Sequence, residues 1–200
     1  MFISFTTGLL TGGSLIIAVG AQNAFLFEQA IKRHYGWLMA SIFIISDALS
    51  MSLGAFGFGY LVQSQPWVLT VSKWAGVAFL LWYAYTKWQA SRHDESIILS
   101  RSRQLAPLKT VLLMGLAVTW LNPHFYLDTM VLMGSLSLAW QNLQWSFIAG
   151  GICASIIWFF GLTLIGRSMT RWVGNIGFWR WFNRLNALIM IVIAFQIATI

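Results

Sequence analysis

Long apolar segments alternate with short polar ones along the whole chain. A helix needs about 20 mainly apolar residues to cross the hydrocarbon core of a bilayer. Six windows of that length are bounded by charged or turn-forming residues, at 3–27, 37–62, 67–88, 109–135, 144–166 and 179–200. Transmembrane strands would instead show alternating runs of about ten residues. The unbroken runs therefore predict an all-α integral membrane protein with six transmembrane helices.

The composition agrees with this pattern of apolar segments. Of the 200 residues, 58% are hydrophobic and only 8% are charged, whereas about a quarter of the residues in soluble domains are charged. No charged residue precedes Glu28, so we expect the first segment to remain as a transmembrane helix and not to be a cleaved signal peptide. One cysteine and three separated histidines offer no disulfide and no metal cluster, and we predict no cofactor.

The basic residues are distributed unevenly among the loops. All of the 12 Lys and Arg residues except Lys73 lie in or beside the first, third and fifth loops. Cytoplasmic loops carry an excess of Lys and Arg, so these three loops are predicted to be cytoplasmic and both termini periplasmic. This orientation accounts for the net charge of +7, and a nucleic-acid partner is not predicted.

A polar stretch divides the chain into two halves. Residues 91–108 separate a first three-helix repeat, 1–90, from a second one, 109–200. Halves with an odd number of helices must be inverted relative to each other if they share a fold. The motifs AVGAQNAF and AVTWLNPHF share three identities at a shift of 99 residues. Inverted repeats with interrupted helices at matching positions indicate the substrate site of a transporter.

The fourth apolar segment contains a helix breaker, Asn122-Pro123. Proline disfavours helical geometry in the preceding residue and is well tolerated at the first position of a helix, where Asn is a good N-cap. We therefore expect this helix to restart at residue 123 and to present free N–H groups and a positive dipole end that suit a carboxylate. A proline kink used only for packing is the alternative.

The first apolar segment contains a corresponding polar interruption. Gly20 is its expected hinge, and Gln22 and Asn23 follow with amide donors and acceptors at membrane depth. These amides either line a site or form hydrogen bonds between helices. Glu28 lies four residues before Lys32, a spacing that predicts an ordinary surface ion pair.

Two acids occupy apolar helices. Asp47 and Asp128 are isolated within the second and fourth segments, and an ionised acid at membrane depth costs about 2.5–3.5 kcal/mol on insertion scales. Each must therefore face protein or water, either as a functional acid or as a neutral hydrogen-bonding group. His124 lies one helical turn before Asp128, where the two could share a proton.

Four motifs together resemble the lysine exporter (LysE) family, and especially its bacterial arginine exporter branch: TWLNPHFYLDTMVLMGSL, GAQNAF, ISDALS and GVAFLLWYAY. The similarity covers about residues 8–166 and is weaker in the last helix. It implies export of basic amino acids, arginine first and lysine second, across the bacterial inner membrane, driven by protons or the membrane potential. In that family Gly-Pro commonly precedes the first-helix motif, whereas Gly20 is followed here by Ala21.

The acids, amides and helix start together suit a cationic amino acid, because acids offset its positive charge and a helix N-terminus can hold its carboxylate. We predict an exporter, not an enzyme, whose partners are a basic amino acid, protons and membrane lipids; a homo-oligomer remains open. The predicted substrate-binding or proton-coupling residues are Gln22, Asn23, Asp47, Asn122, Pro123, His124, Tyr126 and Asp128, with Gly20 as hinge.

Other functions remain possible from the residues alone. Two intramembrane acids also suit a channel, or an exporter of divalent cations or of other amino acids. An enzyme using Asp128 and His124 as an acid–base pair lacks an accompanying nucleophile motif or metal set. A purely structural subunit is a further alternative.

Overall fold

The protein is a bundle of helices. The computed structural model describes residues 1–17, 20–57, 66–92, 106–169 and 175–199, and all regular secondary structure among them is helical. The predicted all-α class is therefore confirmed. In chain order the elements are α1 (Phe2–Ile17), α2 (Ala21–Ile31), α3 (Gly36–Ala55), α5 (Pro66–Arg92), α7 (Leu108–Trp120), α8 (Pro123–Phe125), the π-helical segment η1 (Tyr126–Leu132), α9 (Met133–Leu138), the short 3₁₀ segment η2 (Gln141–Leu143), α10 (Gln144–Ser168) and α11 (Ile176–Thr199).

Both predicted interruptions are present. The first apolar segment forms α1 and α2, which meet at 78°, and the fourth forms α7 and the run from α8 to α9, which meet at 62°. Gly20 precedes α2 with φ −136° and ψ 171°, an extended geometry open to any residue. The first break therefore exists although Ala21, and not a proline, follows Gly20.

Only some of the predicted spans meet the length and apolarity needed to cross a bilayer. Three do so alone, Gly36–Ala55, Gln141–Ser168 and Gly177–Thr199, and the two bent pairs raise the number to five if each crosses as one unit. α5 is not among these segments in the part of the chain that is described. The predicted end of the second helix, the turn before α5 and most of the loop 91–108 lie outside the described residues.

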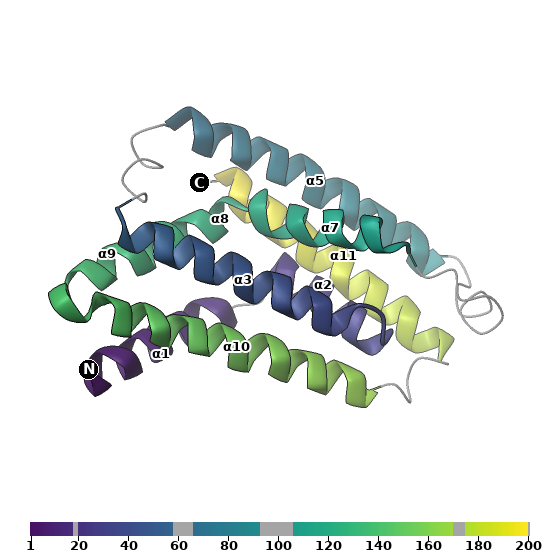
Figure 1. The fold of residues 1–200 in the computed structure, drawn as a ribbon. Coiled ribbons are helices and arrows are strands. Elements are labelled where there is room, and N and C mark those ends of the chain that lie inside the picture. The colour runs from purple at the N-terminus through teal and green to yellow at the C-terminus, as the bar shows by residue number, and fades with distance from the viewer. Residues whose placement is uncertain (18–19, 58–65, 93–105, 170–174, 200) are drawn as a thin grey trace.

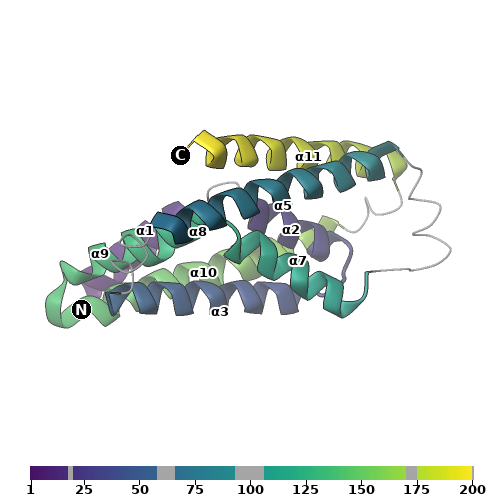
Figure 2. The same ribbon diagram turned by 90° about the horizontal axis from the view of Figure 1, so that it is seen from above.

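The two halves of the chain pack against each other. α1 lies along α10, and α5 lies along α11. Figure 2 shows α5 and α11 together on one side of the bundle and α3 and α10 on the opposite side, with α2 and α7 between them. The α2–α3 connection, the end of α5, the start of α7 and the end of α10 all lie at the end opposite the N-terminus (Figure 1).

Glycines allow α1 and α10 to approach closely. A Cβ atom added at Gly8 would overlap the backbone carbonyl of Phe147, and one at Gly12 would lie 2.8 Å from the Cα atom of Gly151. Small residues at such spacing let the backbones of membrane helices pack closely. The sequence GLLTG therefore forms a packing surface.

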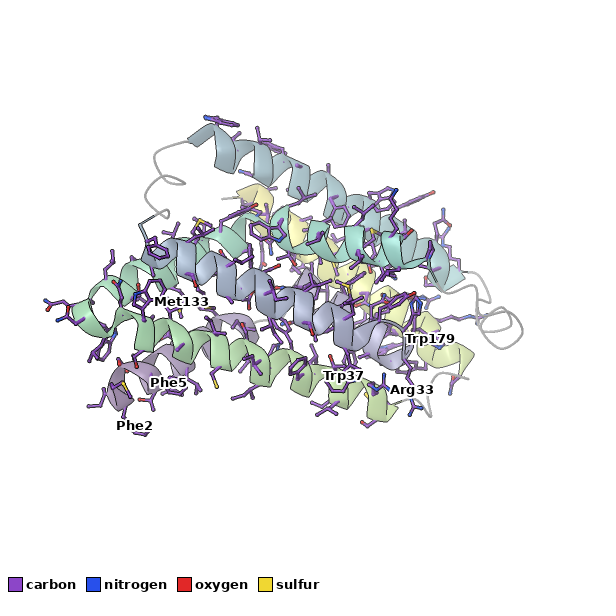
Figure 3. All side chains as sticks on the ribbon, viewed as in Figure 1. Phe2, Phe5, Arg33, Trp37, Met133 and Trp179 are labelled. Atoms are coloured by element: carbon purple, nitrogen blue, oxygen red, sulfur yellow. The ribbon has the colours of Figure 1, made fainter. Side chains whose placement is uncertain are left out.

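The ends of the bundle differ in their side chains. Arg33, Trp37 and Trp179 lie at the end that holds the α2–α3 connection, whereas Phe2 and Phe5 lie at the opposite end (Figure 3). Large apolar side chains on the outer faces of the helices are exposed, as a lipid-facing surface requires. An arginine and two tryptophans thus lie at one end of the bundle, and two phenylalanines at the other.

Candidate functional site

A cavity of about 240 Å³, lined by both polar and apolar residues, lies where the two interrupted helices break. Its size is slightly below the range of about 300–1,000 Å³ typical of pockets for drug-sized ligands, which suits a smaller molecule. The walls come from α1, α2, α3, α11 and the segment that includes α8 and η1. The lining residues are Leu15, Ile16, Gly20, Ala21, Gln22, Asn23, Asp47, Asn122, His124, Phe125, Asp128, Thr129, Ile193 and Gln196.

Most of the residues predicted from the sequence meet in this cavity. The seven that line it are Gly20, Gln22, Asn23, Asp47, Asn122, His124 and Asp128. Pro123 and Tyr126 do not. Pro123 is buried at the start of α8, and the Tyr126 hydroxyl donates a hydrogen bond of 2.6 Å to the carbonyl oxygen of Trp120, across the break. Pro123 and Tyr126 therefore shape the break around the cavity.

The two acids reach the cavity from different elements. Asp47 on α3 is only 2% exposed, and its carboxylate accepts a hydrogen bond from the hydroxyl of Ser155 on α10. Asp128 is partly buried within the π-helical segment η1; π-helical turns occur frequently at functional sites. Among the described residues no hydrogen bond joins His124 to Asp128, although both line the cavity.

The restarted helix at Pro123 is capped by its own residues. Asn122 is extended, and its side-chain oxygen accepts a hydrogen bond of 3.1 Å from the His124 N–H. Pro123 has no N–H, the Phe125 N–H donates to the carbonyl of Asn122 and the Tyr126 N–H donates to that of Pro123. The expectation of free N–H groups at this helix start was wrong, because the cap and the first turn use them. Only the positive end of the helix dipole remains available.

Asn23 bridges the first break. Its Nδ2 donates to the carbonyl oxygen of Ile16 at the end of α1, at 2.9 Å. Its Oδ1 accepts from the indole N–H of Trp158 on α10, at 3.1 Å. A carbonyl near the end of α1, which the helix itself leaves without a partner, is thereby satisfied. Asn23 thus lines the cavity while it joins α1, α2 and α10.

The side-chain amide of Gln22, next to Asn23, has a donor that is unpaired within the described part of the chain. Its Nε2 atom is buried in the cavity wall and has no acceptor among the described residues. Gly20, the N-cap residue of α2, contributes no side-chain hydrogen bond. Near the start of α2, a residue that lines the cavity therefore holds a buried amide donor with no acceptor among the described residues, in contrast to the start of α8.

The structure adds polar residues that the sequence reasoning missed. Gln196 on α11 and Thr129 on η1 line the cavity. The hydroxyl groups of Thr129 and Ser50 lie 2.6 Å apart and join η1 to α3. An isolated amide in an apolar helix, the signal that singled out Gln22, also marks Gln196. Ser155 and Trp158 carry no such signal, because Ser and Trp are common in membrane helices.

Glu28 lies outside this cavity, and its predicted role as part of a surface pair was wrong. Its side chain is 2% exposed, and Oε1 lies 2.8 Å from the Nζ atom of Lys32 and 2.6 Å from that of Lys87. The spacing correctly paired Glu28 with Lys32, but the sequence gave no sign that α5 would bring Lys87 to the same carboxylate. The result is an ion-pair cluster between α2 and α5, in which Glu28 is buried and both lysines are partly buried.

An apolar helical bundle with a cavity at two helix interruptions is typical of membrane transporters. The chain belongs to the LysE type translocator family, which it matches over residues 13–199. The match thus extends through the last helix, beyond residue 166. Membership makes the chain a multi-pass membrane transporter and not an enzyme.

Individual relatives agree with the family. The chain is 38% identical to the arginine exporter protein ArgO of Salmonella schwarzengrund and to that of Klebsiella pneumoniae. Each comparison covers 200 residues, 99% of this chain and 94% of the relative. No solved structure matches the chain.

Proposed function

We propose that this protein is a secondary active exporter of basic amino acids across the bacterial inner membrane. Its preferred substrate is L-arginine, followed by L-lysine. Its similarity over nearly the whole chain to relatives named as arginine exporters supports the substrate class. The chemistry of the cavity supports it independently.

One observation carries this proposal: two carboxylates, those of Asp47 and Asp128, line one cavity. The described residues that line it include no Lys or Arg. A cationic side chain is attracted to such a wall, because charges interact more strongly where water is excluded. The guanidinium group of arginine also presents a planar set of N–H donors that matches carboxylate geometry. We assign cation binding to these two acids.

We further propose that the same acids couple export to protons. A carboxylate holding a cation is stabilised in its ionised form, and proton uptake by that carboxylate weakens the attraction and releases the cation. We assign proton exchange with Asp128 to His124, because both residues line the same cavity. Export would then be accompanied by proton entry.

The proposed topology has six helices in two inverted repeats, 1–90 and 109–200, joined by the loop 91–108, with α5 as the remaining span. The first, third and fifth connections are placed in the cytoplasm and both termini in the periplasm. The α2–α3 connection, the end of α5, the start of α7 and the end of α10 lie at one end of the bundle (Figure 1), and this arrangement supports the proposed orientation. Single cysteines at positions 102 and 142 in a Cys153→Ser background test it, because only position 142 should react with an impermeant thiol reagent added outside cells.

The proposed function is tested by transport in proteoliposomes that contain the full chain. Vesicles preloaded with labelled arginine, lysine, a neutral amino acid or Mn²⁺ are given a pH gradient, and efflux is followed. Arginine and lysine should leave faster than from protein-free vesicles, with arginine ahead. Efflux of Mn²⁺ but not arginine would instead favour the divalent-cation alternative, which two carboxylates also suit. Efflux of only the neutral amino acid would refute the proposed substrate class.

A further inference from the structure

A cavity that binds a basic α-amino acid must hold a negative group as well as a positive one. A basic α-amino acid carries a carboxylate, and the described lining residues include no Lys or Arg to neutralise it. Hydrogen-bond donors must therefore bind the carboxylate, because moving a carboxylate out of water is strongly disfavoured unless donors replace the lost water.

Several donors near the cavity are already used. The side-chain nitrogen of Asn23 donates to Ile16. The N–H of His124 donates to the side chain of Asn122, and the N–H groups of Phe125 and Tyr126 donate to carbonyls of the preceding turn. The start of α8 thus offers its dipole but no backbone donor.

Gln22 is different, because it lines the cavity and its buried amide nitrogen has no acceptor in the part of the chain that the structure describes. Buried donors are almost always paired in native structures, so an unpaired one calls for an explanation. The residue lies in the first turn of the 11-residue helix α2, where the helix dipole also favours a negative group. A carboxylate arriving in the cavity would satisfy this donor.

We propose that the side-chain amide of Gln22 donates a hydrogen bond to the α-carboxylate of the substrate, and that the site thereby selects α-amino acids over the corresponding amines. This inference rests on the proposed function. The substrate then lies with its carboxylate at the start of α2 and its cationic group at Asp47 and Asp128. Gln22 sets specificity at the end of the substrate that every α-amino acid shares.

The test compares binding of arginine with binding of agmatine, which is arginine without its carboxylate, to the purified full-length protein. The wild type should bind arginine about tenfold or more tightly than agmatine, because hydrogen bonds to charged groups are among the stronger ones. Gln22→Met, similar in size but without a donor, should lose most of that preference by weakening arginine alone.

Gln29→Met is the matched control. Gln29 lies two turns further along α2, is buried and has its own unpaired side-chain oxygen, but it does not line the cavity. It should keep the wild-type preference. Gln22→Glu provides a second variant, because a carboxylate there would repel that of arginine and make agmatine the tighter ligand.

The outcomes separate this inference from the proposed function. If the wild type transports arginine but binds agmatine equally well, or if Gln22→Met and Gln22→Glu keep the preference for arginine, the role of Gln22 is refuted and the exporter stands. If the wild type neither binds nor transports arginine, the proposed function fails and this inference fails with it.

Discussion

The indole N–H of Trp158 lies 3.1 Å from the side-chain oxygen of Asn23 and donates a hydrogen bond to it. Asn23 in turn donates to the carbonyl of Ile16. A residue of the second half of the chain therefore helps to close the helix break of the first half. The break that contributes Gln22 to the cavity depends on α10 for its geometry.

This relationship predicts a measurable coupling between Trp158 and Asn23. Trp158→Phe and Asn23→Ala should each lower stability, and their double variant should lose less than the sum of the two. Hydrogen bonds between membrane helices contribute about 0.6 kcal/mol on average and up to about 1.7 kcal/mol, so the coupling should fall in that range. Unfolding midpoints in mixed detergent measure it. Strictly additive losses would contradict the bridge.

The bond from Ser155 to Asp47 predicts a transport phenotype. Ser155→Ala removes the donor that orients this buried carboxylate, and hydrogen bonds to charged groups contribute about 1.5–3 kcal/mol. We expect the KM for arginine efflux to rise roughly tenfold or more. Ser137→Ala is the control, because the buried Ser137 hydroxyl donates only to Gly134 in its own helix. Equal KM values for both variants would show that Asp47 does not need Ser155.

The buried cluster around Glu28 predicts a stability effect. Glu28→Gln leaves Lys32 and Lys87 without their shared carboxylate. Breaking a fully buried pair typically costs about 3–5 kcal/mol, and we expect a smaller loss here because both lysines are partly exposed. Lys73→Gln, also on α5, should have little effect, because Lys73 contacts no carboxylate among the described residues. Thermal unfolding in detergent compares the two. The buried pairing is contradicted if both variants unfold at the same temperature.

Close packing of α1 against α10 predicts different stability effects for alanine substitutions at two glycines of α1, Gly8 and Gly13. Gly8→Ala places a Cβ atom against the backbone of Phe147, which cannot move aside as a side chain could; overpacking typically costs about 1–3 kcal/mol. Gly13→Ala places its Cβ atom 3.9 Å from that of Ala154, an ordinary contact. Unfolding should therefore be easier only for Gly8→Ala, and an equally destabilised Gly13→Ala would argue against this interface.

The sequence predicts the interrupted helices well because their signals are local. Asn122 and Pro123 act on their own backbone, and the structure places the helix start at Pro123. The isolated acids Asp47 and Asp128 were also informative, since an acid in an apolar helix must find a polar environment. The cavity contains both.

The parts that the sequence did not predict depend on contacts between distant segments. Nothing in the residues around Glu28 indicates that Lys87, 59 positions away, would reach its carboxylate. Ser155 and Trp158 contribute donors only because α10 packs against α2 and α3. The capping of the His124 N–H depends on the side-chain rotamer of Asn122, which composition and spacing do not determine.

The central claim is that Asp47 and Asp128 bind the cationic group of an exported amino acid. Arginine efflux from preloaded proteoliposomes under an imposed pH gradient tests it most directly, with Asp47→Asn and Asp128→Asn compared against Asp94→Asn in the polar segment 91–108. We expect efflux to fall at least about tenfold in the first two variants, since each loses a charged partner of the substrate, and to remain unchanged in the third. Undiminished efflux in folded Asp47→Asn and Asp128→Asn proteins would contradict the claim.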